Sequence, residues 1–370
     1  MKILHVINNL GSGGAEKLIE DTLPVMNQYN DIKIELLILT KKNNVFDEKL
    51  KSVGINIYNL ETNIYNPINI FRIRQLLKKN DYDLIHVHLF PTFYWVTIAN
   101  MLNFRNKIPL VMTEHSTYNR RRKYKFFKIF DKLIYNQIDK IISISKDTQL
   151  NLKKWLDTNK DDNKFEIINN GINTEKFKNA EPYKKDDLLN PYSSGNILIT
   201  MVGRFSEHKD QKTLIRAIKN LPNKFHLILI GEGNLKSDCE NLVQNLKIND
   251  RVHFLGFRKD VERIMKTSDI IVLSSNWEGF GLVAVEGMAA GKPVIASDVN
   301  GLKEIVNGFG LLFEQGNEKE LSFLINKLIS DQDFYKEISN KCYNRAKDYS
   351  IRKMTNSLIK VYEKLSIQKY

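Results

Sequence analysis

The sequence is poor in cysteine and in proline, with two cysteines and eight prolines among 370 residues. Cys239 and Cys342 form no metal-ligand pattern, so neither a disulfide scaffold nor a zinc site is predicted, and a reducing compartment fits. Low-complexity tracts, short-period repeats and coiled-coil heptads are also missing. With 42% hydrophobic and 27% charged residues, the composition argues against a disordered chain, and the length predicts two globular domains.

The sequence also lacks an apolar stretch suited to crossing a membrane. The longest segment without Lys, Arg, Asp or Glu, residues 84–104, contains two histidines, a proline and two asparagines. We interpret it as a buried strand, a loop and the start of a helix. The first residues, MKILHVINNLGSGGAEK, run into glycines and do not have the pattern of a signal peptide. We therefore expect a cytoplasmic protein.

Short apolar runs alternate with amphipathic segments along most of the chain. KILHVIN, IKIELLILT, DLIHVHLF, IPLVMTEH and KIISIS are separated by loops and helical patterns. Continuous apolar runs of this length predict the strands of a parallel sheet that is covered on both faces. The pattern therefore predicts an α/β fold that begins with a doubly wound, Rossmann-like domain over residues 1–178.

A polar segment with two prolines, residues 174–195, interrupts this alternation and is interpreted as an interdomain linker. The alternation restarts at NILITMVG and predicts a second doubly wound domain over residues 190–350. Residues 351–370 are predicted to form a terminal helix that packs back on the first domain. Two such domains imply a deep cleft between them, and ligands of open parallel sheets bind beyond the carboxyl ends of the strands.

Two loops of the second domain carry charged residues directly after a predicted strand. VGRFSEHKD places Arg204 and Lys209 where both can bind one diphosphate, unless they are solvated surface cations. In NWEGFGLVAVEGMAAG, Glu278 lies in the loop and Glu286 in the helix that follows. The start of that helix can bind phosphates, and carboxylates accept hydrogen bonds from sugar hydroxyls. The segment therefore predicts a site for a sugar nucleotide, although an acidic helix cap would also explain Glu278.

The first domain has a glycine-rich loop, NNLGSGGAEK, which is suited to a phosphate or sugar. Glu16 stands where the dinucleotide fingerprint needs glycine, so a nicotinamide site is only weakly supported. His115 follows the strand IPLVM, where a buried histidine that caps a helix would explain it. No metal site is predicted, because Asp81 and Asp83 precede a strand rather than follow one.

His86 and His88 lie on one face of a strand, a pattern more typical of packed core than of metal ligands.

Together these motifs resemble the retaining glycosyltransferases of family 4, which have the GT-B fold of two Rossmann-like domains facing each other across a deep cleft. The resemblance rests on Glu278 and Glu286, which stand as the signature Glu-x7-Glu, on VGRFSEHKD, on GGAE and on NNGIN. It covers nearly the whole chain and is most specific in the second domain. One departure is Asp210, where many members of the family carry glycine or asparagine.

The resemblance implies a role for each matched position. Arg204 and Lys209 would stabilise the diphosphate as a leaving group, Glu278 would contact the donor sugar, and His115 would lie near that sugar. The reaction would retain the anomeric configuration, with front-face attack, and would need no metal or other cofactor. The remaining donor-binding positions would be Gly13, Gly14, Glu16, Gly203, Gly279, Phe280, Gly281, Leu282, Val283 and Glu286, the last on the ribose. UDP is the default nucleotide.

Residues 120–140, RRRKYKFFKIFDKLIYNQIDK, are the most basic segment of a chain whose net charge is +13. Apolar and cationic residues alternate there as in an amphipathic helix at an anionic membrane surface, although a solvated helix face would have a similar composition. We expect an acceptor saccharide on a polyprenyl-diphosphate or other lipid carrier, with a soluble saccharide acceptor as the alternative. Such an enzyme would act in cell-surface polysaccharide, capsule, lipopolysaccharide or glycolipid synthesis. The predicted patch for acceptor and membrane is Arg120, Arg121, Arg122 and Lys123, with the enzyme peripheral at the inner face of the cell membrane.

Two other functions are compatible with parts of the sequence. A sugar-nucleotide 2-epimerase can have the same two-domain fold, but it would release an epimerised nucleotide sugar without an acceptor. A basic nucleic-acid-binding protein would explain the positive charge, yet no recognition motif supports it. The Glu-x7-Glu and GGAE motifs favour transfer.

Overall fold

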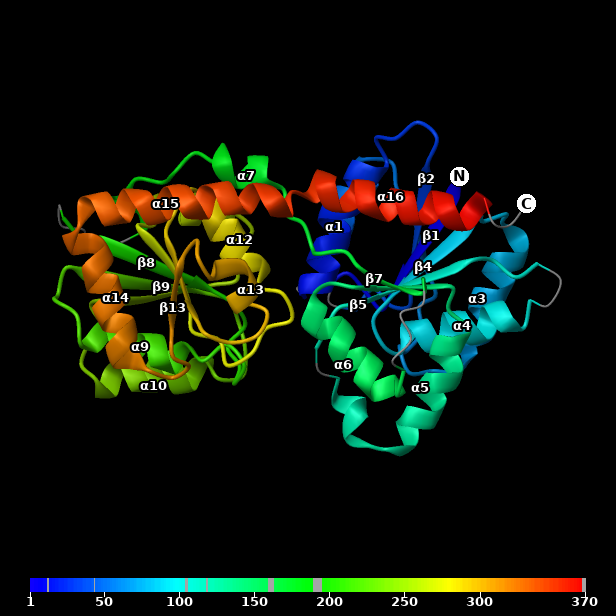
Figure 1. The fold of residues 1–370 in the computed structure, drawn as a ribbon, viewed down its shortest axis with the longest axis horizontal. Coiled ribbons are helices and arrows are strands. Elements are labelled where there is room, and N and C mark those ends of the chain that lie inside the picture. Colours follow the sequence, from blue (N-terminus) through cyan, green and yellow to red (C-terminus); the bar gives the residue numbers. More distant parts are fainter. Residues whose placement is uncertain are drawn as a thin grey trace. The chain divides into compact units, whose positions relative to one another are not determined.

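The computed structural model describes all residues except 12, 43, 104–105, 118, 159–162, 189–194 and 368–370. The side chain of Arg120 is also outside the described part. The chain divides into two compact units. The first unit comprises Met1–Gly171 and Ile351–Tyr370, and the second comprises Ile172–Ser350. Each is a doubly wound parallel sheet with helices packed on it, as predicted (Figure 1).

The first unit contains a seven-stranded sheet in the order β3-β2-β1-β4-β5-β6-β7. Its strands are β1 (Lys2–Ile7), β2 (Lys33–Ile38), β3 (Asn56–Asn59), β4 (Leu84–His88), β5 (Leu110–Glu114), β6 (Lys140–Ser143) and β7 (Phe165–Ile167). Its helices are α1 (Gly14–Met26), α2 (Asp47–Ser52), α3 (Ile68–Lys79), α4 (Thr92–Met101), η1 (Arg120–Lys123), α5 (Phe126–Asn136), α6 (Lys146–Leu156) and α16 (Ile351–Ile367). The strand order reverses between β1 and β4.

The core of the first unit lies on both faces of this sheet because alternate side chains of a strand point to opposite faces. Ile3 and Ile7 of β1 pack in one cluster with residues of α1 and α16, whereas Leu4 and Val6 pack in the other with residues of α3 and α4. Helices α1 and α16 lie side by side on one face (Figure 1).

The second unit contains a six-stranded sheet in the order β10-β9-β8-β11-β12-β13. Its strands are β8 (Ile197–Val202), β9 (Phe225–Ile230), β10 (Val252–Gly256), β11 (Ile270–Leu273), β12 (Val294–Ser297) and β13 (Leu311–Phe313). Its helices are α7 (Thr174–Lys178), α8 (Lys185–Leu188), α9 (Gln211–Lys219), α10 (Lys236–Asn245), α11 (Val261–Thr267), α12 (Leu282–Ala289), α13 (Lys303–Val306), α14 (Glu318–Ser330), α15 (Gln332–Ala346) and η2 (Lys347–Tyr349).

The segment 174–195, expected to be an interdomain linker, lies within the second unit. It contains α7 and α8 and is anchored by side chains of that unit. The backbone N–H of Tyr183 donates to Thr267 Oγ1 at 2.8 Å, and Lys185 Nζ donates to Asp269 Oδ2 at 2.6 Å. The division at residues 171 and 172 thus precedes the expected boundary at 178. Residues 189–194 lie outside the described part of the chain.

Several smaller features bear on the choice of site. The carboxylate of Asp83 accepts a hydrogen bond from the backbone N–H of Lys2 at 2.7 Å, at the start of β4, so the Asp81 and Asp83 pair lies at the edge predicted. Both cysteines are buried and free. No helix among the described residues is long and apolar enough to cross a membrane.

Candidate active site

The second unit brings its two predicted charged loops together. Strands β8 and β11 are neighbours in the sheet, with β9 on the other side of β8, so the strand order reverses between them. The loops that follow β8 and β11 therefore leave the sheet at adjacent positions of its carboxyl edge, which is where open parallel sheets bind ligands.

An ion pair between Lys209 and Glu278 joins these loops. The Lys209 ammonium group contacts Glu278 Oε1, and the two side chains are only 14% and 11% exposed. Ser275 Oγ donates a second hydrogen bond to the same carboxylate oxygen at 2.9 Å. Because ion pairs of low exposure are weakly screened, the loops hold a cation and a carboxylate together at the predicted position of the diphosphate and sugar.

Further contacts between the same loops fix their geometry. The backbone N–H of Asn276 donates to the carbonyl of His208 at 2.8 Å, and its side-chain amide donates to the carbonyl of Glu207 at 2.6 Å. The ring of His208 lies 5.8 Å from that of Trp277. Burial lowers the pKa of His208, and the nearby Lys209 ammonium lowers it further. His208 is therefore neutral at neutral pH.

Arg204 is exposed in the loop after β8, where its guanidinium can reach a ligand. Gly203 makes room for its cationic neighbour, since a Cβ atom there would approach Lys209 Cδ to 3.3 Å. Asp210 ends the loop in the left-handed region, with φ of 45°, and its carboxylate caps α9 by accepting from Thr213 Oγ1 at 2.6 Å. Glycine and asparagine both tolerate positive φ, so this conformation would suit either residue at position 210.

The start of α12 follows the Glu278 loop directly. Gly281 precedes the helix with φ of +85°, and a Cβ atom there would lie 2.6 Å from Leu302 Cδ2. Phe280 is buried and its ring packs edge-on against Tyr349, with centroids 5.4 Å apart. Only the backbone of Phe280 is thus suited to contact a ligand. Glu286 lies in the second turn of α12 and is half-buried, as are Leu282 and Val283 in the first.

In the first unit, the glycine-rich loop leads into α1. Gly13 caps the helix, and both Gly13 and Gly14 are exposed; Ser12 lies outside the described residues. The Glu16 carboxylate folds back over Gly13, because a Cβ atom on that glycine would lie 2.2 Å from Glu16 Oε2. Burial raises the pKa of Glu16. The Glu16 carboxyl group already occupies the helix start that the sequence assigned to a donor phosphate.

His115 follows β5 and is half-buried. Its Nε2 lies 3.0 Å from Nδ1 of His88, and burial lowers the pKa of His115 to about 4, so the ring is neutral at neutral pH. A small pocket beside it is lined by Glu114, Asn119 and Arg121, among other residues.

The predicted basic patch is largely used inside the first unit, which differs from the sequence interpretation. Arg121 is 5% exposed and its Nε lies 3.1 Å from Asp131 Oδ2, while Arg122 Nη2 lies 3.1 Å from Glu114 Oε2. These buried arginines need their carboxylate partners and cannot present their charges to a membrane. Lys123 is exposed. The side chain of Arg120 lies outside the described part of the structure.

Sequence reasoning missed Ser275, Asn276 and His208 as parts of the site. Their only signal is position, since all three lie in the loops after β8 and β11. The buried histidine His5, which contacts His88, was also missed, because its sequence context is that of an ordinary strand.

The fold and this arrangement define a glycosyltransferase built from two Rossmann-like domains. Residues 12–176 match the family model described as Glycosyltransferase Family 4, and residues 189–348 match that described as Glycosyl transferases group 1. The chain belongs to this family of GT-B glycosyltransferases.

Individual proteins agree with that assignment. The chain is 33% identical over 354 residues to a glycosyltransferase of Methanocaldococcus jannaschii, covering 93% of this chain and 94% of the relative. It is 26% identical over 370 residues to a Campylobacter jejuni N-acetylgalactosamine-N,N'-diacetylbacillosaminyl-diphospho-undecaprenol 4-alpha-N-acetylgalactosaminyltransferase, covering 96% and 97%. The crystal structure of Anabaena HepE in complex with UDP and glucose has the same fold, with a TM-score of 0.84, 22% identity and coverage of 98% and 99%.

Proposed function

We propose that this protein is a retaining glycosyltransferase that takes a sugar from a nucleotide sugar, with UDP as the nucleotide. The observation that carries the proposal is the contact of Lys209 with Glu278 beside the exposed Arg204 and the start of α12. Cations and a helix start suit the diphosphate, and the carboxylate suits the sugar hydroxyls next to it. A solved structure of the same fold contains UDP and glucose, which supports this choice of donor.

The ion pair has a direct consequence for donor binding. Without a ligand, the Lys209 ammonium is held by Glu278. A diphosphate offers Lys209 a stronger anion, so donor binding replaces the contact and leaves Glu278 to accept hydrogen bonds from the sugar. Glu286, in the second turn of α12, takes the ribose hydroxyls.

The chemistry follows from these positions. The bond between the anomeric carbon and the diphosphate oxygen breaks, and the diphosphate leaves with the electron pair. Arg204, Lys209 and the start of α12 stabilise the negative charge that develops there. The acceptor hydroxyl forms its bond to the anomeric carbon on the same face, and its proton passes to the departing phosphate oxygen. No metal ion is needed for these steps.

We further propose that the acceptor is a saccharide on a diphospho-polyprenol carrier. The Campylobacter relative is named for such a substrate. A lipid-linked acceptor requires the enzyme to reach a membrane surface, and the exposed apolar side chains of helix α5 in the first unit support this helix as the contact. Phe126, Ile129, Phe130 and Leu133 are 54–67% exposed and lie at helical spacing on one face. This set is called the α5 apolar face.

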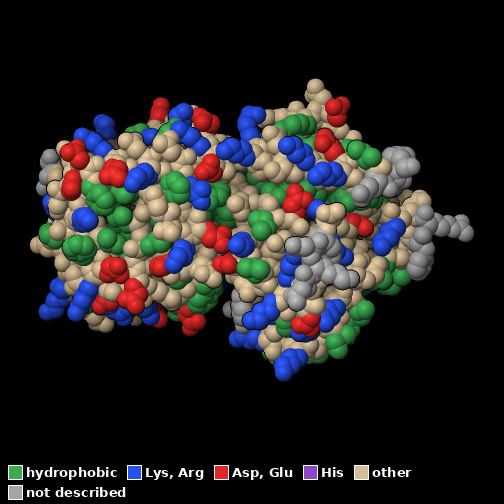
Figure 2. Space-filling model, viewed as in Figure 1, with side chains coloured by type: hydrophobic (Ala, Val, Ile, Leu, Met, Phe, Trp, Pro, Cys, Tyr) green, Lys and Arg blue, Asp and Glu red, His purple; other side chains and the backbone are tan. Residues whose placement is uncertain are grey.

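The surroundings of the α5 apolar face favour an anionic bilayer. Lys123 and Lys125 are exposed just before the helix, and Tyr124 between them is 60% exposed. Basic residues next to an apolar helix face suit an anionic lipid surface. Elsewhere on the face of the molecule in Figure 2, basic and acidic side chains are interspersed.

Membrane contact is tested by flotation with vesicles. Ile129→Ser with Leu133→Ser should abolish binding to vesicles that contain phosphatidylglycerol, because the insertion face is lost. Phe323→Ser in α14 of the second unit is the matched control, since Phe323 is 64% exposed and lies outside this face. Equal binding of both variants and the unaltered protein would reject the membrane role of α5.

The transferase proposal is tested by a screen of nucleotide sugars for protection against thermal unfolding. A donor at one hundred times its Kd stabilises the folded protein by about 2.7 kcal/mol. The protecting nucleotide sugar is then incubated with a diphospho-undecaprenol-linked saccharide. Transfer to the lipid with retained configuration supports the proposal. Release of an epimerised nucleotide sugar without acceptor would instead establish the epimerase.

A further inference from the structure

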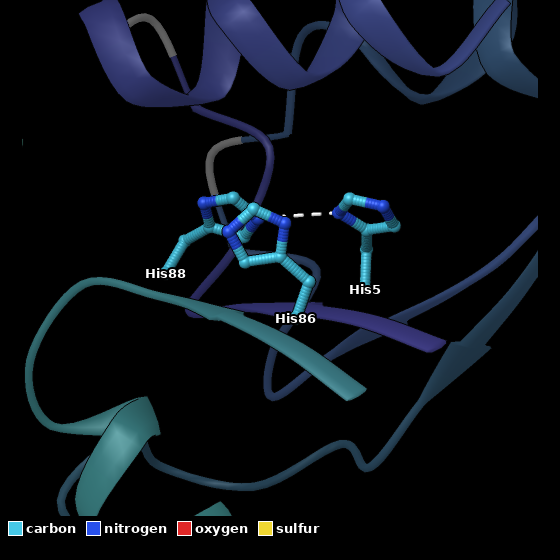
Figure 3. A group of neighbouring side chains, drawn as sticks. All are labelled: His5, His86 and His88. Carbon is cyan, nitrogen blue, oxygen red and sulfur yellow. Dashed lines mark hydrogen bonds between the residues drawn. The ribbon is translucent and has the colours of Figure 1, made fainter. Parts of the chain in front are cut away.

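Four histidines gather on one face of the first unit's sheet. His5 lies on β1, His86 and His88 on β4, and His115 directly after β5. The parallel register pairs His5 with His86 and pairs His88 with Thr113. Two adjacent strands and the loop after a third therefore contribute imidazoles to one cluster beneath α1 and α16. Figure 3 shows the rings of His5, His86 and His88 and the hydrogen bond between the first and the last.

Three of these rings form a continuous chain of hydrogen bonds. Nδ1 of His5 lies 3.2 Å from Nε2 of His88, and Nδ1 of His88 lies 3.0 Å from Nε2 of His115. Burial lowers the pKa of all three, to about 3 for His5, well below the usual range for His88 and to about 4 for His115. The three rings are therefore neutral at neutral pH, and each carries one N–H.

His86 lies outside this chain. Its Nδ1 is 2.6 Å from the Tyr362 hydroxyl of α16, and its Nε2 is 2.7 Å from Thr113 Oγ1. Ring nitrogens of His5, His86 and His88 lie within 4.8 Å of one another, which is the spacing of a loose metal site. A metal ion would have to break hydrogen bonds that already use both nitrogens of His86 and one of His5. The observed contacts thus favour a hydrogen-bonded chain over a metal centre.

The chain of hydrogen bonds requires His5, His88 and His115 all to adopt the same tautomer. His88 bonds through both nitrogens, so its single proton makes it a donor to one neighbour and an acceptor from the other. If His88 carries the proton on Nδ1, it donates to Nε2 of His115 and accepts from Nδ1 of His5, and all three rings are Nδ1–H. If the proton is on Nε2, all three rings are Nε2–H. The buried end of the chain thereby determines which form His115 adopts.

The environment of His5 selects between the two forms. Its Nε2 is buried and has no hydrogen-bond partner among the described residues. The pocket that His5 lines has mainly apolar walls, including Leu18, Met354 and Leu358. An Nε2–H group there would be an orphaned buried donor, which is rarer in proteins than an under-used acceptor. The Nδ1–H form leaves only a lone pair at this atom.

We propose that His88, backed by His5, is a positioning residue that holds His115 in the Nδ1–H form. His115 then presents a hydrogen-bond donor, at the ring nitrogen outside the chain, to an oxygen of a bound sugar. It cannot serve as the base that deprotonates the acceptor, because its lone pair is occupied by His88. Only this consequence for substrate rests on the proposed function; the tautomer is a property of the free protein.

The tautomer is read directly from long-range proton–nitrogen spectra of protein labelled with 15N at its seven histidines. Single substitutions assign the signals. At pH 7.5 in the absence of substrate, we expect His5, His88 and His115 all to show a protonated Nδ1 and an unprotonated Nε2. A protonated Nε2 on any of the three would overturn the proposal, whatever the protein's activity.

A matched pair of variants then tests the positioning role. The side-chain amide of His88→Asn lies near the former Nδ1 and keeps a donor for His115, whereas that of His88→Gln lies near the former Nε2 and keeps only the partner of His5. We expect His88→Asn to retain the His115 tautomer and a kcat within about threefold. His88→Gln should let His115 populate both tautomers and lower kcat about tenfold at unchanged donor KM.

Binding of UDP to each variant, measured by calorimetry, controls for folding. Equal His115 spectra, or equal kcat values, in the two variants would exclude His88 as the positioning residue. If the unaltered protein transferred no sugar at all, the proposed function would fail, while the spectra would still decide the tautomer.

Discussion

Lys209 and Glu278 form an ion pair although 69 residues separate them in the chain. The pair exists because β8 and β11 are neighbours, so that the loops after them leave the sheet side by side. In the proposed mechanism this contact is exchanged for contacts with the donor. We therefore expect the loss of Lys209 to lower the rate and the loss of Glu278 to weaken binding of the donor sugar.

Replacing Lys209 with glutamine should lower kcat about a hundredfold, or by roughly 3 kcal/mol of transition-state stabilisation. The leaving diphosphate would lose a cation that the site holds in place before the reaction. Steady-state kinetics measure the effect, with Lys212→Gln as the control. Lys212 lies in α9 and pairs with Asp238 at 3.0 Å, away from the site. A loss of less than threefold for Lys209→Gln would contradict its role.

Replacing Glu278 and replacing Glu286 should have different effects on the affinities for UDP and for a UDP-sugar. Glu286→Gln should weaken both ligands about tenfold, since the ribose is common to them. Glu278→Gln should weaken only the UDP-sugar and bind UDP equally or more tightly, because Lys209 is no longer held by a carboxylate. Titration calorimetry with both ligands measures this. Weaker UDP binding by Glu278→Gln would show that the two roles are misassigned.

The first unit should lose stability as the pH falls from about 6.5 toward 4. Unfolded histidines take up a proton near pH 6.5, whereas burial lowers the pKa of His5 to about 3 and of His115 to about 4. Between these values the unfolded chain binds protons that the folded chain does not, so acid favours unfolding. Each such histidine contributes up to about 1.4 kcal/mol per pH unit to the slope.

Urea unfolding at pH 7, 6 and 5 measures this slope. A Trp277→Phe background confines the tryptophan fluorescence to Trp95 and Trp155 of the first unit. In that background His5→Asn should reduce the slope between pH 6 and 5 by up to about 1.4 kcal/mol per pH unit. An unchanged slope would mean that His5 is not held neutral by burial.

Removal of divalent metal ions should leave transfer largely intact. The leaving group is stabilised by Arg204, Lys209 and a helix start. The Asp81 and Asp83 pair lies at the start of β4 in the first unit, away from the carboxyl ends of the strands. Activity after treatment with EDTA and gel filtration is the measurement. Strict dependence on added manganese would overturn the proposed mechanism.

The sequence predicted most of the fold because buried parallel strands are continuous apolar runs. It did not predict β3, whose four residues, Asn56–Asn59, are half-buried to exposed and partly polar at the edge of the sheet. The position of the linker was also misjudged. Its polar composition suggests an exposed tether, but Tyr183 and Lys185 find partners that are 84 residues away in the chain.

The candidate site was predictable only in part. Strand ends and loop charges were sufficient to predict that the loops of Lys209 and Glu278 meet. The burial of Arg121 was not predictable, since it depends on Asp131 and Tyr135 meeting it in the folded unit. The histidine chain depends on strand register, which pairs His5 with His86 and His88 with Thr113 and is not visible in an apolar run.

Helix α16 belongs to the first unit although the whole second unit precedes it in the chain. Its Tyr362 is fully buried and bonds to His86, so it completes the packing over the histidines. During synthesis the first unit therefore lacks α16 until residues 172–350 and then the helix itself have been made. The second unit can therefore finish folding first. Until α16 has been made, the face of the first unit that packs against it stays exposed.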